Sequence, residues 1–479
     1  MIIPMRQSLS AVAAVLWLAA GCSRPAQDRS WVARSAIYEV NVRAFSPTGD
    51  FKGVTAGLDR IQAVGTDVVW LMPIHPVGVL NRKGSLGSPY SVRDYHAIDS
   101  ASGTAGDLRA LVQAVHARGM RIIIDWVPNH TAWDNVWVNQ HPAFYVRDER
   151  GQLTVPLDPQ GKPTDWTDVA ELDYGNPELR RAMIAAMRHW LEEFDLDGFR
   201  VDVAGFVPDA FWQEAVPALR SAVPRRILLL AEWGDLNMHR LGFDLTYGWD
   251  TYSRLKAVWR GARADSFVLG EVADLGAMPP GGMRLRFITN HDETAWDNPP
   301  VTLFGGSAGA RAAFVAMALL PGRPLLYNGQ GVESPQKIGL FVREPIVWDQ
   351  PGADSARAFY RRVIGLARTD SAFFAGDFRP VETGAASDVI AYGRGDAIVL
   401  VNARAHEVRV AVTGWEVDGA RDLLSDRMPQ GDTLTLAAHD ALVLARRAPN
   451  GQRRPPPKRN ARGSSSRARQ AASLWVAPS

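Results

Sequence analysis

An arginine and a carboxylate stand two positions apart in a short apolar stretch, residues 196–205. In a strand, residues i and i+2 point to the same face, so Arg200 and Asp202 are expected to project together. A neighbouring guanidinium favours the ionised form of a carboxylate. An ionised carboxylate at a strand end suits a nucleophile or an electrostatic stabiliser, although the stretch alone fits a structural ion pair equally well.

Further polar side chains follow other predicted strands: Asp125, Asn129 and His130 after one, Glu232 after another, His291 and Asp292 after a later one. In an α/β barrel the C-terminal strand ends converge on one face, where active sites lie. We therefore expect Asp202, Glu232 and Asp292 to share a pocket. Retaining glycoside hydrolysis uses an ionised nucleophile and a protonated acid about 5–5.5 Å apart, and a third carboxylate can stabilise the positive charge that develops on the sugar.

The elements that must position these groups alternate between strand and helix. Predicted strands cover residues 37–42, 67–72, 120–124, 196–205, 227–231, 243–249, 285–289 and 324–327, and predicted helices cover 54–64, 104–118, 211–223, 310–320, 356–368 and a segment beginning at 176. Repeated β-then-α units predict an α/β protein built on a (β/α)8 TIM barrel. A doubly wound open sheet is the alternative, but no glycine-rich phosphate turn follows the first strand.

Two regions interrupt or follow this repeat. Residues 131–175 are polar and too long for an ordinary loop, so we expect a small inserted subdomain after strand 3 of a barrel that spans 36–130 and 176–377. After residue 378 short strands are separated by Gly, Asp and Asn turns. That pattern predicts a C-terminal all-β domain, a β-sandwich over 378–446.

The N-terminus has the features of a targeting segment. Arg6 precedes an apolar run at 9–20 that is short for a membrane span. The run ends in Leu18-Ala19-Ala20-Gly21-Cys22, which resembles a bacterial lipoprotein signal, so residues 1–22 are predicted to be that signal, Cys22 the lipidation site and 23–35 a tether. An ordinary signal peptide with an incidental cysteine is the alternative. Cys22 is the only cysteine, which excludes disulfides within the chain.

The other end of the chain is strongly basic. Nine Lys and Arg residues and no acid lie between 446 and 479, so removing them from the formal net charge of +2 leaves −7 for the rest. The same stretch carries runs of proline and serine, a composition that cannot bury a core. Residues 447–479 are therefore predicted to be a disordered basic tail, solvated or altered by a frameshift. Binding of nucleic acid or an anionic surface is the alternative, and no nucleic-acid partner is expected.

Four segments together resemble the signature regions of the α-amylase family of glycoside hydrolases, and they occur in the family's order: residues 125–130 (DWVPNH), 198–202 (GFRVD), 231–234 (AEWG) and 287–292 (FITNHD). The resemblance covers roughly residues 37–445. It implies that Asp202 is the nucleophile, Glu232 the general acid/base with a raised pKa, and Asp292 the transition-state stabiliser. It also implies that Arg200 keeps Asp202 ionised.

The resemblance assigns further residues to the substrate. Tyr90, within residues 88–95, resembles the aromatic that stacks on the sugar at the cleavage point, and His130 and His291 match contacts to sugar hydroxyls. Asp125 matches a structural carboxylate. No cofactor is required for the chemistry. Sixteen tryptophans suit a sugar-binding cleft, since an indole buries apolar faces while its N–H stays polar.

The chain departs from the family pattern in three places. Residues 203–205 (VAG) stand where many members have a lysine-histidine pair that contacts the leaving-side sugar and a calcium ion. Residues 169–173 match the family's fifth region only loosely, and the loop after the first strand lacks the acid/amide pattern of the alternative metal site. Asn129 matches a calcium ligand of many amylases. Metal ligands are therefore not assigned, and a structural calcium ion stays an open alternative.

The sequence thus predicts a retaining enzyme that cleaves α-1,4-glucosidic bonds of starch-like glucans or maltodextrins. It is expected at the bacterial cell envelope, anchored to a membrane by its N-terminal lipid and facing the periplasm or the outer surface. One alternative is a transglycosylase or isomerase of the same family, acting on trehalose or sucrose. The other is a catalytically silent glycan-binding lipoprotein, against which the retained trio of carboxylates argues.

Overall fold

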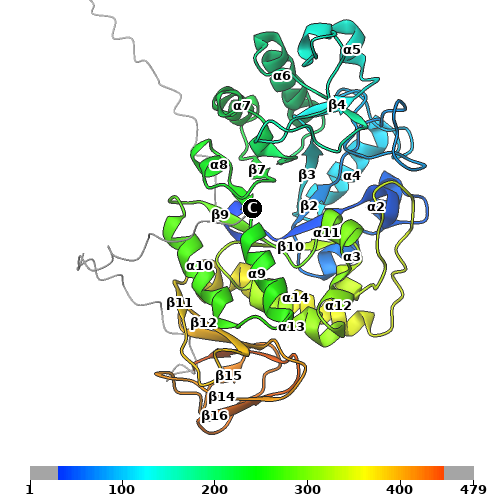
Figure 1. Ribbon diagram of the computed structural model, residues 1–479. Coiled ribbons are helices and arrows are strands. Elements are labelled where there is room, and N and C mark those ends of the chain that lie inside the picture. Colours follow the sequence, from blue (N-terminus) through cyan, green and yellow to red (C-terminus); the bar gives the residue numbers. More distant parts are fainter. Residues whose placement is uncertain (1–30, 447–479) are drawn as a thin grey trace, which may run out of the picture.

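The computed structural model describes residues 31–446. Eight parallel strands close into a barrel in the order β1-β10-β9-β8-β7-β6-β3-β2 (Figure 1). The strands are β1 (Ile37–Val40), β2 (Val68–Leu71), β3 (Arg121–Trp126), β6 (Gly198–Val201), β7 (Leu228–Ala231), β8 (Leu245–Tyr247), β9 (Met283–Arg286) and β10 (Arg323–Tyr327). Almost all of their residues are buried, as expected of parallel strands that are covered on both faces. The barrel prediction is confirmed, and the open-sheet alternative is wrong because the sheet closes.

Helices surround the barrel (Figure 1). They are α1 (Val42–Phe45), α2 (Phe51–Ala56), α3 (Leu58–Ala63), α4 (Ala105–Ala117), α6 (Pro177–Glu193), α7 (Asp209–Ala222), α8 (Asn237–Arg240), α9 (Trp249–Trp259), α10 (Asp265–Ala277), α11 (His291–Trp296), α12 (Pro300–Leu303), α13 (Gly306–Ala318), α14 (Ala353–Thr369) and α15 (Ser371–Phe374), with 3-10 turns η1 (Val32–Arg34), η3 (Ala204–Phe206) and η4 (Gln330–Val332). Asn176 caps α6 as its sequence indicates, since its side chain accepts from the backbone N–H of Glu178.

Several elements differ from the sequence expectations. The helix expected at 54–64 is two helices, α2 and α3, which meet at Gly57, and the ring of Phe45 lies so close to that glycine that a Cβ would not fit. Helices α9 and α10 were not expected, and α10 buries only a narrow face while Leu269 is 60% exposed. A helix with such a mixed surface has weak periodicity. Strand β9 ends at Arg286, three residues before the expected end.

The connection between β3 and β6 is a small folded insert. It contains β4 (His130–Ala132), α5 (Val136–Gln140), the 3-10 turn η2 (Pro142–Phe144) and β5 (Val169–Glu171). Strands β4 and β5 pair antiparallel, with His130 opposite Glu171. The insert expected after strand 3 is therefore present, and it places its first residues beside the C-terminal end of β3.

The C-terminal part is all β. A five-stranded antiparallel sheet has the order β11-β12-β13-β17-β15, beside a two-stranded sheet of β14 and β16. Its strands are β11 (Phe378–Pro380), β12 (Val389–Arg394), β13 (Ala397–Asn402), β14 (Val408–Ala411), β15 (Arg421–Asp422), β16 (Thr433–Leu436) and β17 (Ala441–Ala445). It packs on α13 through Tyr392 and Arg394, which donate to backbone carbonyls of Ala316 and Leu319 at 3.0 and 2.6 Å.

Three of the predictions concern the two ends of the chain. The signal peptide (1–22) with Cys22, most of the tether (23–35) and the basic tail (447–479) lie outside residues 31–446. Within residues 31–446, no helix combines the length and the apolar composition that crossing a membrane requires.

Candidate active site

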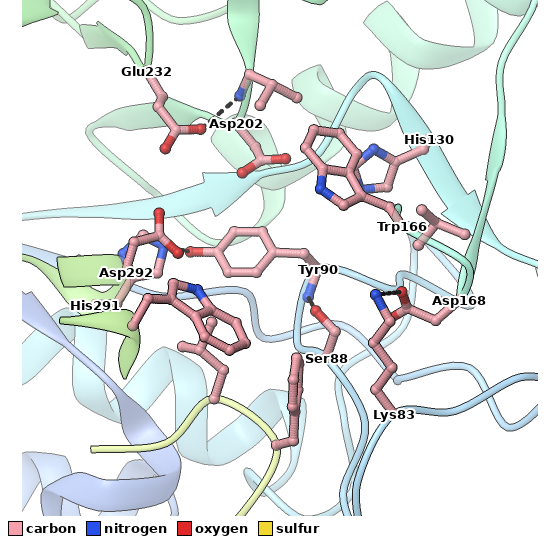
Figure 2. A pocket seen from close by; sticks show the side chains of 15 residues that line it. Lys83, Ser88, Tyr90, His130, Trp166, Asp168, Asp202, Glu232, His291 and Asp292 are labelled. Atoms are coloured by element: carbon pink, nitrogen blue, oxygen red, sulfur yellow. Dashed lines mark hydrogen bonds and ion pairs between the residues drawn. The ribbon is translucent and has the colours of Figure 1, made fainter. Parts of the chain in front are cut away.

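A cavity of about 260 Å³ opens at the C-terminal ends of the barrel strands. It collects side chains from the loop after β2, the insert, the ends of β6 and β7, helix α11 and the loop after β10 (Figure 2). The lining residues are Lys83, Ser88, Tyr90, His130, Trp166, Asp168, Val169, Asp202, Val203, Glu232, His291, Asp292, Trp296, Leu340 and Phe341. Six of the seven side chains predicted to act at the active site are among them, and Arg200 lies directly behind.

The buried guanidinium of Arg200 joins three carboxylates at the base of this cavity. Its Nη1 atom lies 2.8 Å from Oδ1 of Asp202 and 2.8 Å from Oδ1 of Asp125, and its Nη2 atom lies 2.6 Å from Oε1 of Glu232. Its Nε atom donates to the hydroxyl of Tyr247 at 3.2 Å. Adjacent nitrogens of one rigid fork therefore set the separation of Asp202 and Glu232.

A backbone group also holds Glu232. The N–H of Val203, directly after β6 and Asp202, donates to Oε2 of Glu232 at 2.8 Å. Val203 has φ 34° and ψ 47°, the left-handed conformation, which β-branched residues rarely adopt. The strained turn aims this N–H across the pocket at a carboxylate that comes from the next barrel strand.

A second hydrogen-bonded chain runs through Tyr90 and His291. The hydroxyl of Tyr90 donates to Oδ2 of Asp125 at 3.0 Å and lies 2.7 Å from Nε2 of His291, and the two rings stack with centroids 5.2 Å apart. Nδ1 of His291 pairs with Glu39 on β1, and its Nε2 lies 3.4 Å from Asp292. Burial alone would lower the pKa of His291, but the charges of Asp292 and Glu39 outweigh it and raise that pKa to about 9. His291 is therefore an imidazolium that donates from both nitrogens.

The charges in the cavity do not balance if every acid is ionised. One guanidinium and one imidazolium face five carboxyl groups: Glu39, Asp125, Asp202, Glu232 and Asp292. Burial, helped by the charges of Asp202 and Asp292 and opposed by Arg200, raises the pKa of Glu232 to about 8. Burial likewise raises the pKa of Asp125 to about 7, against the pull of Arg200. Glu232 thus keeps its proton at neutral pH and can donate it.

The predicted histidine at the start of the insert also faces the cavity. Burial lowers the pKa of His130, although Asp202 and Asp168 oppose the shift, so its ring is neutral. Asn129 places its amide nitrogen 3.3 Å from Nδ1 of this ring. If that amide donates, the other ring nitrogen carries the proton and can donate to a sugar hydroxyl.

The resemblance leaves a structural calcium ion near Asn129 as an open alternative. Among residues 31–446, no group of three or more His, Cys, Asp or Glu side chains is arranged to hold a metal ion. Asn129 also directs its amide at His130.

Two placements differ from the expectation that these groups follow strand ends. Asp125 lies within β3, and His291 and Asp292 form the first turn of α11, where Asn290 caps the helix by accepting from Glu293 at 2.9 Å. The short helix turns both side chains into the cavity. The convergence expected for Asp202, Glu232 and Asp292 is nevertheless present.

Several lining or supporting residues were missed by the sequence reasoning. Glu39 had a signal, because it is a lone carboxylate inside an apolar strand. Trp166, Asp168 and Trp296 had none, since each lies in irregular or short structure whose orientation no periodicity reveals. Trp296 is 65% exposed although it borders the cavity.

Aromatic side chains fill the region where the chain departs from the family pattern. A Cβ atom on Gly205 would lie 2.1 Å from the indole of Trp233. Phe206 meets Trp233 edge-on with centroids 5.6 Å apart and stacks on Trp166 at 5.5 Å. A residue larger than glycine at position 205 is therefore incompatible with Trp233 as it lies.

The chain that forms this cavity is similar to known proteins of one family. The family model described as "Alpha amylase, catalytic domain" matches residues 26–277, more than half of the chain. The chain belongs to the α-amylase family. The solved structure of the noncanonic maltogenic α-amylase AmyB from Thermotoga neapolitana superimposes with a TM-score of 0.77 at 31% identity, covering 86% of this chain and 99% of AmyB.

Curated relatives within the family differ in activity. α-Amylase MalA of Haloarcula japonica is 29% identical over 395 residues, which is 79% of this chain and 56% of MalA. The trehalose synthase/amylase TreS of Mycolicibacterium smegmatis is 27% identical over 322 residues, 56% of this chain and 52% of TreS. The chain spans about half the length of these two relatives. Relatives in one family thus differ in their named activities, and the reaction and the substrate of this chain are to be derived from its site.

Proposed function

We propose that this α-amylase family member hydrolyses α-1,4-glucosidic bonds of starch-like glucans or maltodextrins, with retention of the anomeric configuration. The observation that carries the proposal is the shared guanidinium. Arg200 contacts Asp202 and Glu232 through adjacent nitrogens, while the raised pKa of Glu232 keeps its proton in place. Retaining hydrolysis requires just such a pair, one carboxylate ionised and its close neighbour protonated.

In the first half of the reaction, an oxygen of Asp202 attacks the anomeric carbon of the bound sugar. The bond from that carbon to the glycosidic oxygen breaks, and Glu232 gives its proton to the departing oxygen. The product is a glycosyl ester on Asp202. Arg200 holds Asp202 in place through its 2.8 Å contact, and the N–H of Val203 orients Glu232.

In the second half, the ionised Glu232 takes a proton from water. The water oxygen attacks the anomeric carbon, the ester bond breaks, and Asp202 returns to its ionised state. Asp292, whose side chain is 33% exposed beside His291, stabilises the positive charge that develops on the sugar in both halves. Tyr90, His130 and His291 bind the sugar from the other walls of the cavity.

The proposal is tested by product analysis on starch, maltotriose, trehalose, sucrose and isomaltose, with NMR to identify the anomer released first. The expected result is release of α-anomeric maltooligosaccharides from starch and maltotriose. The Asp202→Asn variant should lose this activity while its circular dichroism stays unchanged. Full turnover in that variant, or a β-anomer as the first product, would contradict the mechanism.

Glycosyl transfer is the second candidate, and a specific finding favours it. Relatives of the chain include the trehalose synthase of Pimelobacter, 31% identical over 212 residues, which is 38% of this chain and 36% of that protein. The same glycosyl ester can be intercepted by a sugar hydroxyl in place of water. Incubation with maltose distinguishes the two reactions, because hydrolysis yields only glucose whereas isomerisation yields trehalose.

We also propose that the protein is a lipid-anchored envelope protein. The support is the small-residue run that ends at Cys22. Replacing Cys22 with serine should release the protein from the membrane fraction into the soluble periplasmic fraction. Retention of the Cys22→Ser variant in the membrane fraction would contradict the anchor.

A further inference from the structure

One segment of the cavity wall is fastened at both of its ends. Residues 83–88, in the loop after β2, are here called the crossbar. At one end, Nζ of Lys83 lies 3.0 Å from Oδ1 of Asp168 and donates to the carbonyl of Asp165 at 3.3 Å. The crossbar is therefore tied to the insert.

The other end of the crossbar is tied to the loop after β10. The N–H of Leu86 and the hydroxyl of Ser85 donate to the carbonyl of Phe341 at 3.0 and 3.4 Å. Gly84 packs so closely on Phe341 that an added Cβ would lie 2.6 Å from that side chain. The crossbar thus spans the cavity from the insert to Phe341.

The crossbar lies on the side of the cavity away from the proton donor. In Figure 2, Lys83 and Ser88 lie on one side of Tyr90, and Glu232 lies on the other. Because Glu232 protonates the departing oxygen in the proposed reaction, the leaving part of the substrate occupies its side. The sugar that is retained, and every unit beyond it toward the non-reducing end, must lie on the crossbar side.

The ion pair of Lys83 and Asp168 can form a wall at one end of the cavity, because its carboxylate is held in the protein interior. The Asp168 side chain is only 5% exposed and Lys83 is 33% exposed. The wall continues on the other flank through Phe341 to Trp296, whose rings meet edge-on with centroids 5.8 Å apart. The exposed indole of Trp296 offers an apolar face to a sugar ring that lies against this wall.

We propose that the Lys83–Asp168 ion pair closes the non-reducing side of the cavity, and that it restricts cleavage to bonds near the non-reducing ends of glucans. Lys83 and Asp168 are then specificity-determining residues that act as a barrier. This inference rests on the proposed function, because the assignment of sides depends on Glu232 as the acid. The substrate class that follows is the free non-reducing end of a maltooligosaccharide.

The test compares a maltoheptaoside labelled at its reducing end with the same compound blocked by a 4,6-acetal on its non-reducing unit, and chromatography of the shortened labelled products measures cleavage. The wild type should cleave the blocked compound at least about tenfold more slowly than the free one, measured as kcat/KM. The double variant Lys83→Ser/Asp168→Ser should cleave both at rates within about threefold of each other. Both partners are removed because a lone buried carboxylate at position 168 is strongly destabilising.

A matched control is the exposed pair of Arg188 and Glu192 on α6, 2.9 Å apart and 45% and 42% exposed. The variant Arg188→Ser/Glu192→Ser should keep the discrimination of the wild type. Equal cleavage of both compounds by the wild type, or unchanged discrimination in the Lys83/Asp168 variant, overturns the proposal.

Binding measurements test the barrier independently of the proposed hydrolysis. In the Glu232→Gln background, calorimetry should show weaker binding of blocked than of free maltoheptaose, and the Lys83/Asp168 double variant should remove that difference. The same result with a wild type that hydrolyses nothing leaves the barrier in place and overturns the proposed function. Equal binding of both compounds to the Glu232→Gln protein overturns the barrier, whatever the turnover. Because this comparison does not need the Lys83/Asp168 double variant, it also tests the barrier if that variant fails to fold.

Discussion

The backbone N–H of Val203 donates to Oε2 of Glu232 across 2.8 Å, although the two residues follow different barrel strands. The donor directly follows the proposed nucleophile, and the acceptor is the proposed acid. A shift of the turn after β6 would therefore move both groups together. The distance between nucleophile and acid is set by backbone as well as by Arg200.

Replacing Glu232 with glutamine tests its role as the acid. We expect kcat on maltodextrin to fall by about 10²–10⁴, because proton donation to the departing oxygen is lost. A maltosyl fluoride needs little protonation to depart, so its first turnover should be affected much less. Rapid-mix kinetics on both substrates measures the contrast, and an equal loss on both would show that Glu232 has another role.

The pH dependence of activity and of stability also follows from Glu232. A carboxyl whose pKa is raised to about 8 in the folded state loses its proton, and with it the acid function, as pH rises through about 8. Its contribution to stability is fully present below its unfolded pKa of about 4.5 and is lost as pH rises toward 8. Glu232→Gln should therefore raise Tm by a few degrees at pH 9 and change it little at pH 4.5. Calorimetry at the two pH values checks this, and an equal shift at both would contradict it.

Arg200 is expected to tolerate no replacement. Arg200→Ala leaves buried carboxylates without their cation, which costs roughly 3–5 kcal/mol of unfolding free energy. Arg200→Lys keeps the charge but offers one nitrogen where two nitrogens contact Asp202 and Glu232, so we expect activity to be lost with a smaller loss of stability. Urea titration and turnover measure both. Wild-type activity in the lysine variant would show that the fork is not needed.

The hydroxyl of Tyr90 can be tested separately from its ring. Tyr90→Phe keeps the stacking on His291 but removes the link to Asp125, so kcat should fall about tenfold with KM little changed. Tyr90→Ala removes the ring as well and should also raise KM. Steady-state kinetics of the two variants decides whether the hydroxyl and the ring act separately. Identical kinetics in both would show that they do not.

The close packing of Gly205 predicts coupling between two residues. Gly205→Ala should cost roughly 1–3 kcal/mol, because its Cβ collides with the indole of Trp233. In a Trp233→Ala background the same substitution should cost much less. A double-mutant cycle by urea denaturation measures the difference, and additive costs would show that Trp233 moves aside freely.

The sequence was sufficient for the barrel because its strands are continuous apolar runs with helices between them. It was sufficient for the convergence of Asp202 and Glu232 because both directly follow such strands. It misplaced His291 and Asp292, because one turn of helix after β9 has no periodicity of its own. Trp296 and the pair of Lys83 and Asp168 were beyond prediction, since contacts between irregular segments depend on tertiary packing alone.

The pairing of Glu39 with His291 joins residues 252 positions apart. Glu39 leaves the ribosome early, yet its partner follows β9, the seventh barrel strand along the chain. At roughly 5–20 residues per second, Glu39 waits many seconds for the histidine to be synthesised. A nascent chain stalled before position 291 lacks both His291 and Asp292. Catalytic competence is therefore acquired late in synthesis, after the segment that follows β9 has reached β1.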